Sequence, residues 1–338
     1  MAGLPQDNDK ECMFYDPPAD GRIHCRLCPH ECRIADGKTG ICRVRQHRDG
    51  VLYALTYSQV SSINLDPIEK KPLYHFHPGS WILSLGTLGC NLACDFCQNW
   101  EISQGDVPMR TLTPQQAVEM ARREQRNIGI AYTYNEPLIW YEYVRDTAFL
   151  AREHDLKNVL VTNGYLNEQP LRELLPAIDA MNVDVKSFAE DFYRTLCKGR
   201  AEPVRRTVEI AHAAGCLVEL TNLVIPGHND SEEDLRALVD WVAQLDPTMP
   251  LHFSRYHPAY KLEAPATPLE TLHTAYRIAK EKLQYVYLGN VAGAGGEDTQ
   301  CPECAATVVS RSGFSARVTG IRHGKCAHCG AQLNIAGV

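Results

Sequence analysis

Residues 86–100 read GTLGCNLACDFCQNW and carry three cysteines, Cys90, Cys94 and Cys97, on one short stretch. The apolar run WILSLG at 81–86 leads into it and is typical of a strand buried on both faces. Three thiolates on one loop can bind three corners of a cubane iron–sulfur cluster and leave the fourth iron without a protein ligand. A structural zinc site would close with a fourth cysteine or histidine, which this loop lacks. The stretch therefore predicts an open metal position suited to chemistry.

Six further short runs rich in β-branched residues follow this strand, at 128–134, 158–164, 180–187, 217–226, 251–258 and 285–291. Helical patterns separate them. Thr113 is an expected N-cap with Pro114 at the first helical position, and Ser231 is an expected N-cap followed by acidic residues. Regular alternation of strand and helix predicts an α/β fold, either a βα barrel or a doubly wound sheet. In both, functional loops follow the carboxyl ends of the strands.

The composition limits the class of protein. The chain has 338 residues, of which 44% are hydrophobic and 22% charged, with a formal net charge of −7. Its longest apolar runs fall short of the ~18 residues that a membrane span requires, and the N-terminus lacks the pattern of a secretory signal. We therefore expect a cytoplasmic protein that is not a membrane protein. In that reducing compartment, 14 cysteines point to metal or redox chemistry rather than to disulfides.

A C-terminal pair of CxxC motifs, CPEC at 301–304 and CAHC at 326–329, has a spacing close to that of zinc sites. The expected ligands are Cys301, Cys304, Cys326 and Cys329. So short a tail cannot bury a sufficient core, so a metal would supply most of its folding free energy. We favour zinc over iron here, in a structural role.

An N-terminal set of four cysteines is less specific. Its members are Cys25, Cys28, Cys32 and Cys42. Four thiolates can close a tetrahedral zinc site or hold an auxiliary iron–sulfur cluster, and His24, His30 or His47 could replace one of them. The sequence leaves zinc and a second cluster open as alternatives.

The CxxxCxxC loop, with Phe96 before its third cysteine, resembles the signature of the radical S-adenosylmethionine (SAM) superfamily. The resemblance implies a 4Fe–4S cluster on Cys90, Cys94 and Cys97 whose open iron is chelated by SAM. A low-potential donor of the flavodoxin or ferredoxin type would supply one electron. Cleavage of SAM would then yield methionine and a 5′-deoxyadenosyl radical that takes hydrogen from a substrate.

Other strand ends extend the resemblance. TYNEP at 133–137 replaces the Gly-Gly-Glu-Pro stretch of the superfamily, and TNG at 162–164, DVK at 184–186 and IPGHND at 225–230 are similar to loops of glycyl radical enzyme activating enzymes. The implied SAM contacts are Phe96, Asn135, Glu136, Thr162, Asn163, Asp184, Lys186 and His257. Alternatively, Asp184 and Lys186 form an internal salt bridge, and His257 is structural.

The whole-chain pattern resembles a prokaryotic subgroup named for its association with AMMECR1 and Memo family proteins, related in its core to pyruvate formate-lyase activating enzyme. This implies a partial (β/α)6 TIM-like barrel over 76–294, a four-cysteine module over 22–75, a zinc-ribbon or rubredoxin-like module over 295–338 and a flexible tail over 1–21. The implied activity is hydrogen abstraction from a protein or partner-delivered substrate.

Two alternative functions stay open at this point. The chain could activate a glycyl radical enzyme, which requires a partner with a C-terminal glycine loop. It could instead be a zinc-ribbon protein that binds nucleic acid and uses the barrel as a scaffold. The net negative charge argues against nucleic acid.

Overall fold

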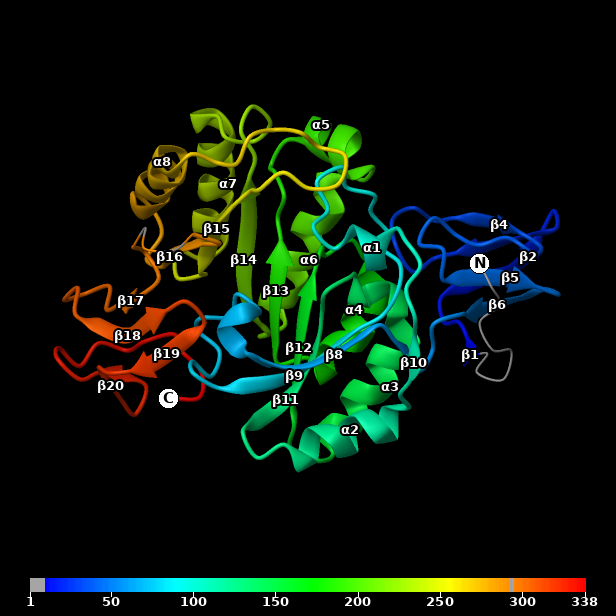
Figure 1. Ribbon diagram of the computed structural model, residues 1–338, viewed down its shortest axis with the longest axis horizontal. Helices are drawn as coiled ribbons and strands as arrows, with labels where there is room; N and C mark the ends of the chain where they lie inside the picture. Colours follow the sequence, from blue (N-terminus) through cyan, green and yellow to red (C-terminus); the bar gives the residue numbers. More distant parts are fainter. Residues whose placement is uncertain (1–9, 292, 294) are drawn as a thin grey trace.

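The computed structural model describes residues 10–291, 293 and 295–338. Its centre is an eight-stranded sheet in the order β16-β15-β14-β13-β12-β11-β9-β8 (Figure 1). The strands are β8 (Ser62–Pro67), β9 (Trp81–Gly86), β11 (Asn127–Tyr132), β12 (Lys157–Thr162), β13 (Ala180–Asp184), β14 (Leu217–Val224), β15 (Leu251–Arg255) and β16 (Val286–Gly289). The seven from β9 to β16 are parallel and were expected from their apolar runs.

Six helices of seven residues or more connect these parallel strands, and the short helices α1 (Trp100–Ser103) and α5 (Glu190–Phe192) lie in the same connections. The six longer helices are α2 (Pro114–Arg123), α3 (Tyr141–Arg152), α4 (Glu168–Leu174), α6 (Ala201–Ala213), α7 (Glu232–Leu245) and α8 (Leu269–Lys280). The expected caps are confirmed: Thr113 accepts from the Gln116 amide in a capping box with Pro114 at N1, and Ser231 accepts from the Asp234 amide. Each helix buries one apolar stripe against the sheet, as an amphipathic surface helix must.

The strand order decides between the two expected architectures. Neighbouring parallel strands follow one another in the chain without the reversal that defines a doubly wound sheet. The fold is therefore the expected partial (β/α)6 barrel, with β16 as an additional last strand. Among the described residues, β8 and β16 are the two edge strands of this sheet and do not pair with each other, so the barrel is open. The antiparallel strand β8, which pairs with β9, was not expected, and it moves the start of the core from 76 to about 62.

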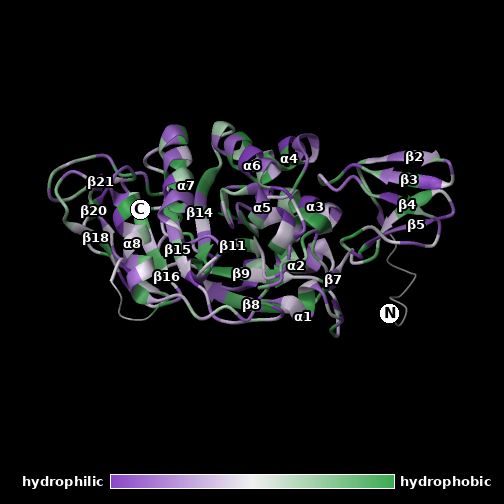
Figure 2. Ribbon diagram, turned by 90° about the horizontal axis from the view of Figure 1, so that it is seen from above, coloured by the Kyte–Doolittle hydropathy of each residue, from purple (hydrophilic) through white to green (hydrophobic). Residues whose placement is uncertain are grey.

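The N-terminal module consists of two small antiparallel sheets at one end of the molecule (Figures 1 and 2). Its strands are β1 (Lys10–Glu11), β2 (Tyr15–Ala19), β3 (Arg22–Cys25), β4 (Arg33–Ala35), β5 (Arg45–Arg48) and β6 (Val51–Ala54). The expected flexible tail over 1–21 is wrong for its described part, because β1 pairs with β6 and β2 pairs with β3. Residues 1–9 of that tail lie outside the described residues.

The C-terminal module lies at the opposite end (Figure 2) and packs against the segment that precedes β9. Its strands are β17 (Thr299–Gln300), β18 (Thr307–Ser312), β19 (Ser315–Val318), β20 (Ile321–Arg322) and β21 (Lys325–Cys326). Arg311 crosses the interface: its guanidinium donates to the Tyr74 carbonyl at 2.7 Å, and its Nε lies 3.7 Å from Glu69 Oε1, with both side chains fully buried. The backbone of Ala336 also exchanges hydrogen bonds with residues 75 and 77. The module is therefore fixed to the barrel.

Replacing Arg311 with Ala should loosen this docking. The substitution leaves the Glu69 carboxylate buried without its cation, which typically costs about 3–5 kcal/mol. We expect faster amide hydrogen exchange across 299–338 and a lower Tm. The matched control is Arg317→Ala, which removes an exposed arginine of the same module. Equal exchange in both variants would show that the ion pair does not hold the module.

Candidate active site

An open cavity of about 450 Å³ lies at the carboxyl ends of the parallel strands. Of the eleven residues that the sequence analysis assigned to the cluster or to SAM, ten line this cavity, and His257 does not. The ten are Cys90, Cys94, Phe96, Cys97, Asn135, Glu136, Thr162, Asn163, Asp184 and Lys186. Residues from the ends of four strands, β9, β11, β12 and β13, thus meet in one place, as parallel α/β topology requires.

The cysteine loop follows β9 and is held by close backbone contacts. Gly89 has φ +90°, and a Cβ there would lie 2.5 Å from the Cys42 carbonyl, so glycine is required. Cys90 Sγ accepts from the Leu92 amide at 3.3 Å and from Asn163 Nδ2 at 3.6 Å. Donors of this kind stabilise thiolate sulfur and tune a bound cluster.

The thiols of the loop differ in environment. Burial raises the pKa of Cys90 and of Cys97, whereas a hydrogen bond with Cys197 lowers the pKa of Cys94. Cys197 ends the short helix Tyr193–Cys197 and is fully buried. Its sequence context does not single it out, because only the fold brings it to the loop.

Asn135 fixes the cysteine loop instead of pointing a free amide into the cavity. Its Oδ1 accepts from the Thr87 amide at 3.0 Å, and its Nδ2 donates to the Gly89 carbonyl at 2.9 Å. Both ends of the loop segment are thereby tied to the end of β11. The residue acts on the cysteines through the backbone.

Glu136 presents a buried carboxylate at the wall of the cavity. It accepts from Thr162 Oγ1 at 2.7 Å, the Asn163 amide at 2.8 Å and the Leu138 amide at 2.9 Å. Burial nevertheless raises the pKa of Glu136 to about 7, because desolvation outweighs these donors. A cation bound beside it would restore the ionised form.

Tyr134 takes the place of a glycine expected from the resemblance, and it does so with φ +74°. Its hydroxyl donates to Asp66 Oδ2 at 2.5 Å, and the Lys71 ammonium lies 4.7 Å from its ring centroid and 2.6 Å from the same carboxylate oxygen. The side-chain contacts offset the cost of the left-handed backbone. Tyr134 and Lys71 both line the cavity. Lys71 was missed, because Asp66 and Lys71 come from the unexpected strand β8 and the turn after it.

Asp184 and Lys186 form the salt bridge that the sequence left as an alternative, and both also line the cavity. Lys186 Nζ lies 3.0 Å from Asp184 Oδ2 and 5.9 Å from the Phe96 ring centroid. The Asp184 side chain is 40% exposed, so its carboxylate remains open to the cavity. An internal salt bridge and a place in the lining of the cavity are therefore compatible for these two residues.

The contact between His257 and the adenosyl group that the resemblance implies stays a prediction. His257 is exposed and is not among the described residues that line the cavity. Its neighbour Tyr256 turns inward instead, is fully buried and donates to the Leu262 carbonyl at 2.8 Å. A buried tyrosine fixes this turn, and the adjacent side chain consequently faces solvent.

The C-terminal cysteines form a compact group. Their four sulfur atoms lie within 4.8 Å of one another, with Cys301–Cys329 at 3.6 Å and Cys304–Cys326 at 3.7 Å. A tetrahedral zinc ion with Zn–S bonds of about 2.3 Å holds its sulfurs about 3.8 Å apart. The geometry therefore fits a single metal ion held by four thiolates.

The residues of the cavity fit an open iron–sulfur cluster with a zwitterionic ligand. Cys90, Cys94 and Cys97 would hold the cluster, and no fourth cysteine or histidine is among the described lining residues. Glu136 offers a carboxylate to an ammonium group, and Lys186 offers an ammonium to a carboxylate. None of the described helices is both long and apolar enough to cross a membrane.

Comparisons with known proteins identify the family of this chain. Residues 85–242 match the model of the radical SAM superfamily. An uncharacterized protein of Methanocaldococcus jannaschii is 45% identical over 334 residues, covering 96% of this chain and 99% of that protein. The pyruvate formate-lyase-activating enzyme of Clostridium pasteurianum is 22% identical over 177 residues, covering 50% of this chain and 72% of the enzyme.

Solved structures show the same fold. SuiB of Streptococcus suis, in a crystal structure bound to S-adenosylmethionine, aligns with a TM-score of 0.50 at 14% identity, covering 63% of this chain and 52% of SuiB. The cysteine loop, the strand order and the matched family model together establish that the chain belongs to the radical SAM superfamily.

Proposed function

We propose that this protein reductively cleaves S-adenosylmethionine and abstracts hydrogen from a protein or partner-delivered substrate. The observation that carries the proposal is the cavity in which three thiols of one loop face a buried carboxylate and an ion pair from neighbouring strand ends. When bound, the 4Fe–4S cluster supplies one electron to the SAM sulfonium and generates a 5′-deoxyadenosyl radical.

The side chains of the cavity have separate parts in this proposal. Glu136 binds the ammonium of the methionine moiety, because its carboxylate is buried and held by three donors. Lys186 binds the carboxylate of the same moiety, and Asp184, which is partly exposed, binds a ribose hydroxyl. Thr162 and Asn163 orient Glu136 and Cys90. Phe96 packs under the bound group.

The substrate and partners belong to the proposal as well. The mouth of the cavity is open, which suits a substrate presented by another macromolecule. We propose a flavodoxin- or ferredoxin-type electron donor and, on the resemblance to their associated subgroup, AMMECR1 and Memo family proteins as partners. The free thiols fit a reducing compartment, the cytoplasm.

A second candidate function is activation of a glycyl radical enzyme. The similarity to the Clostridium pasteurianum activating enzyme favours it. This function differs from the first because it requires a partner chain that acquires a stable glycyl radical, detectable by electron paramagnetic resonance.

For the C-terminal module we propose a structural zinc ion, on the compact arrangement of its four sulfur atoms.

Replacing Cys94 with Ala should abolish SAM cleavage. With two thiolates left on the loop, the cluster would lose a corner ligand, and neither iron nor the open position would be held. The measurement is 5′-deoxyadenosine formed anaerobically from SAM and dithionite, after cluster reconstitution. The control is Cys216→Ala, which removes a buried core thiol outside the cavity lining. Continued 5′-deoxyadenosine formation by the Cys94→Ala variant would disprove the proposed function.

SAM affinity should increase with pH up to about 7 and then level off. The folded-state pKa of Glu136 is raised to about 7, so at lower pH the carboxyl is protonated and cannot pair with an ammonium. Below pH 7, the affinity should fall by up to about tenfold per pH unit. Equilibrium binding of SAM to the reconstituted protein between pH 6 and 8 measures this.

The control for this pH dependence is Glu136→Gln, which keeps the shape but not the charge. It should weaken SAM binding at pH 8 by about 1.5–3 kcal/mol, the range for a hydrogen bond to a charged group. Its affinity should also lose the dependence on pH below 7. An unchanged pH profile in the variant would assign the titration to another group.

A further inference from the structure

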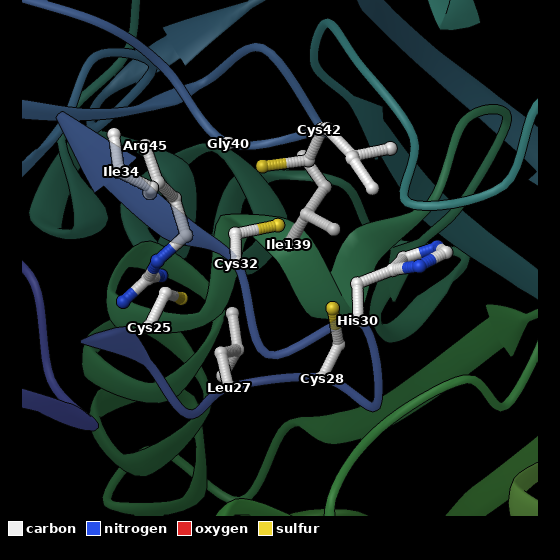
Figure 3. A pocket seen from close by; sticks show the side chains of 11 residues that line it. Cys25, Leu27, Cys28, His30, Cys32, Ile34, Gly40, Cys42, Arg45 and Ile139 are labelled. Atoms are coloured by element: carbon white, nitrogen blue, oxygen red, sulfur yellow. The ribbon is translucent and has the colours of Figure 1, made fainter. Parts of the chain in front are cut away.

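The four cysteines of the N-terminal module surround a small pocket of their own, separate from the cavity of the barrel (Figure 3). Its cavity volume is about 10 Å³, against about 450 Å³ for the cavity of the barrel. The other lining residues are mostly apolar: Leu27, His30, Ile34, Gly40, Ile41, Arg45 and Ile139. The enclosed part is narrow, so it suits a compact inorganic group rather than an organic ligand.

The spacing of these thiols differs from that of the C-terminal module. Among the described residues, the C-terminal four cysteines are the one group of three or more Cys, His, Asp or Glu whose ligand atoms all lie within 4.8 Å of one another. The four N-terminal thiols line one shared pocket (Figure 3), but no three of them lie within 4.8 Å of one another. A cubane cluster inserts iron and sulfide between its thiolates and holds them farther apart than one zinc ion does. The wider arrangement therefore favours a cluster.

Arg45 supplies a second, independent observation. It lines the pocket and is 1% exposed. Its two terminal nitrogens each lie 3.0 Å from a carboxylate oxygen of Glu142, but its Nε has no hydrogen-bond partner among the described residues. A buried N–H without a partner costs about 1–3 kcal/mol. A cluster sulfur in the pocket would accept from it.

The pocket also adjoins the cysteine loop of the barrel. The Cys42 carbonyl lies against Gly89, the residue before Cys90. On the other side, His30 Nε2 lies 2.6 Å from the Asn91 carbonyl oxygen, and Asn91 Oδ1 accepts from the same Asn163 amide group that contacts Cys90. Two metal centres would thus be separated by single layers of backbone and side chain.

We propose that the N-terminal module holds a second 4Fe–4S cluster that delivers electrons to the cluster site of the barrel. Its ligands are Cys25, Cys28, Cys32 and Cys42. One electron passes from a reduced flavodoxin- or ferredoxin-type donor to the N-terminal cluster, and the same electron then reduces the barrel cluster, which reoxidises the first. Ile41 lines the pocket and is 55% exposed, so the pocket reaches the surface there. The delivery role rests on the proposed function, whereas the second cluster does not.

The first test removes the barrel cluster and keeps the N-terminal site. The full-length variant Cys90→Ala/Cys94→Ala/Cys97→Ala, purified and reconstituted anaerobically, should retain about four irons and four sulfides per chain and give a cluster signal in electron paramagnetic resonance after reduction. Adding Cys28→Ser and Cys42→Ser should remove both. Zinc without iron in the triple variant would overturn the proposal, and so would iron that survives the two serine substitutions. Retention of one C-terminal zinc and the far-ultraviolet circular dichroism check that each variant is folded.

The second test addresses electron delivery with the barrel cluster intact. In the Cys28→Ser/Cys42→Ser variant, reduction of the barrel cluster by reduced flavodoxin should be slower by about tenfold or more. The reduction is measured by electron paramagnetic resonance in the absence of SAM. Reduction by dithionite, a small reductant with direct access to the open cavity, should slow far less. Equal rates with flavodoxin in variant and parent would overturn the delivery role. If the parent contains both clusters but forms no 5′-deoxyadenosine, the proposed function fails while the second cluster stands.

Discussion

The close approach of two backbones at Gly89 is the constraint on which the architecture of the site depends. The Cys42 carbonyl occupies the position that a side chain at residue 89 would need. Gly89 also donates its amide to the Ile102 carbonyl and receives the Asn135 side chain on its own carbonyl. The cysteine loop is therefore held between the N-terminal module and the end of β11. A bulkier residue at position 89 would therefore push the cysteine loop of the barrel away from the N-terminal module that carries Cys42.

Desolvation explains how the cavity combines charged groups with an apolar surround. Glu136 is buried and satisfied by three donors, yet burial still raises its pKa to about 7. Asp184 and Lys186 avoid this penalty by pairing with each other at 3.0 Å. A zwitterion of the methionine type would bring one charge to each of these positions. Binding would pair the buried Glu136 carboxylate with a cation and favour its ionised form, which is where such a site gains affinity.

Much of this arrangement was predictable from local patterns. The seven parallel strands followed from their apolar runs, and the cavity residues followed from their positions at strand ends, because parallel topology brings those ends together. Contacts made by side chains from distant segments were not predictable. Strand β8 is a polar-flanked edge strand without an apolar run, so its Asp66 and the adjacent Lys71 were missed. Likewise, nothing local distinguishes Tyr256 from His257, and packing alone decided which of the two turned inward.

The three cysteine sets can be distinguished by the spacing and surroundings of their sulfur atoms. The C-terminal four are close together, stand at the far end of the molecule and connect to the barrel through Arg311, which suits a structural ion. The barrel three line a cavity whose described lining residues include no fourth cysteine or histidine. The N-terminal four are wider apart, border an unpaired buried N–H and adjoin the loop that carries the barrel three. A structural ion needs no such proximity to the site of chemistry, whereas a centre that exchanges electrons with it does.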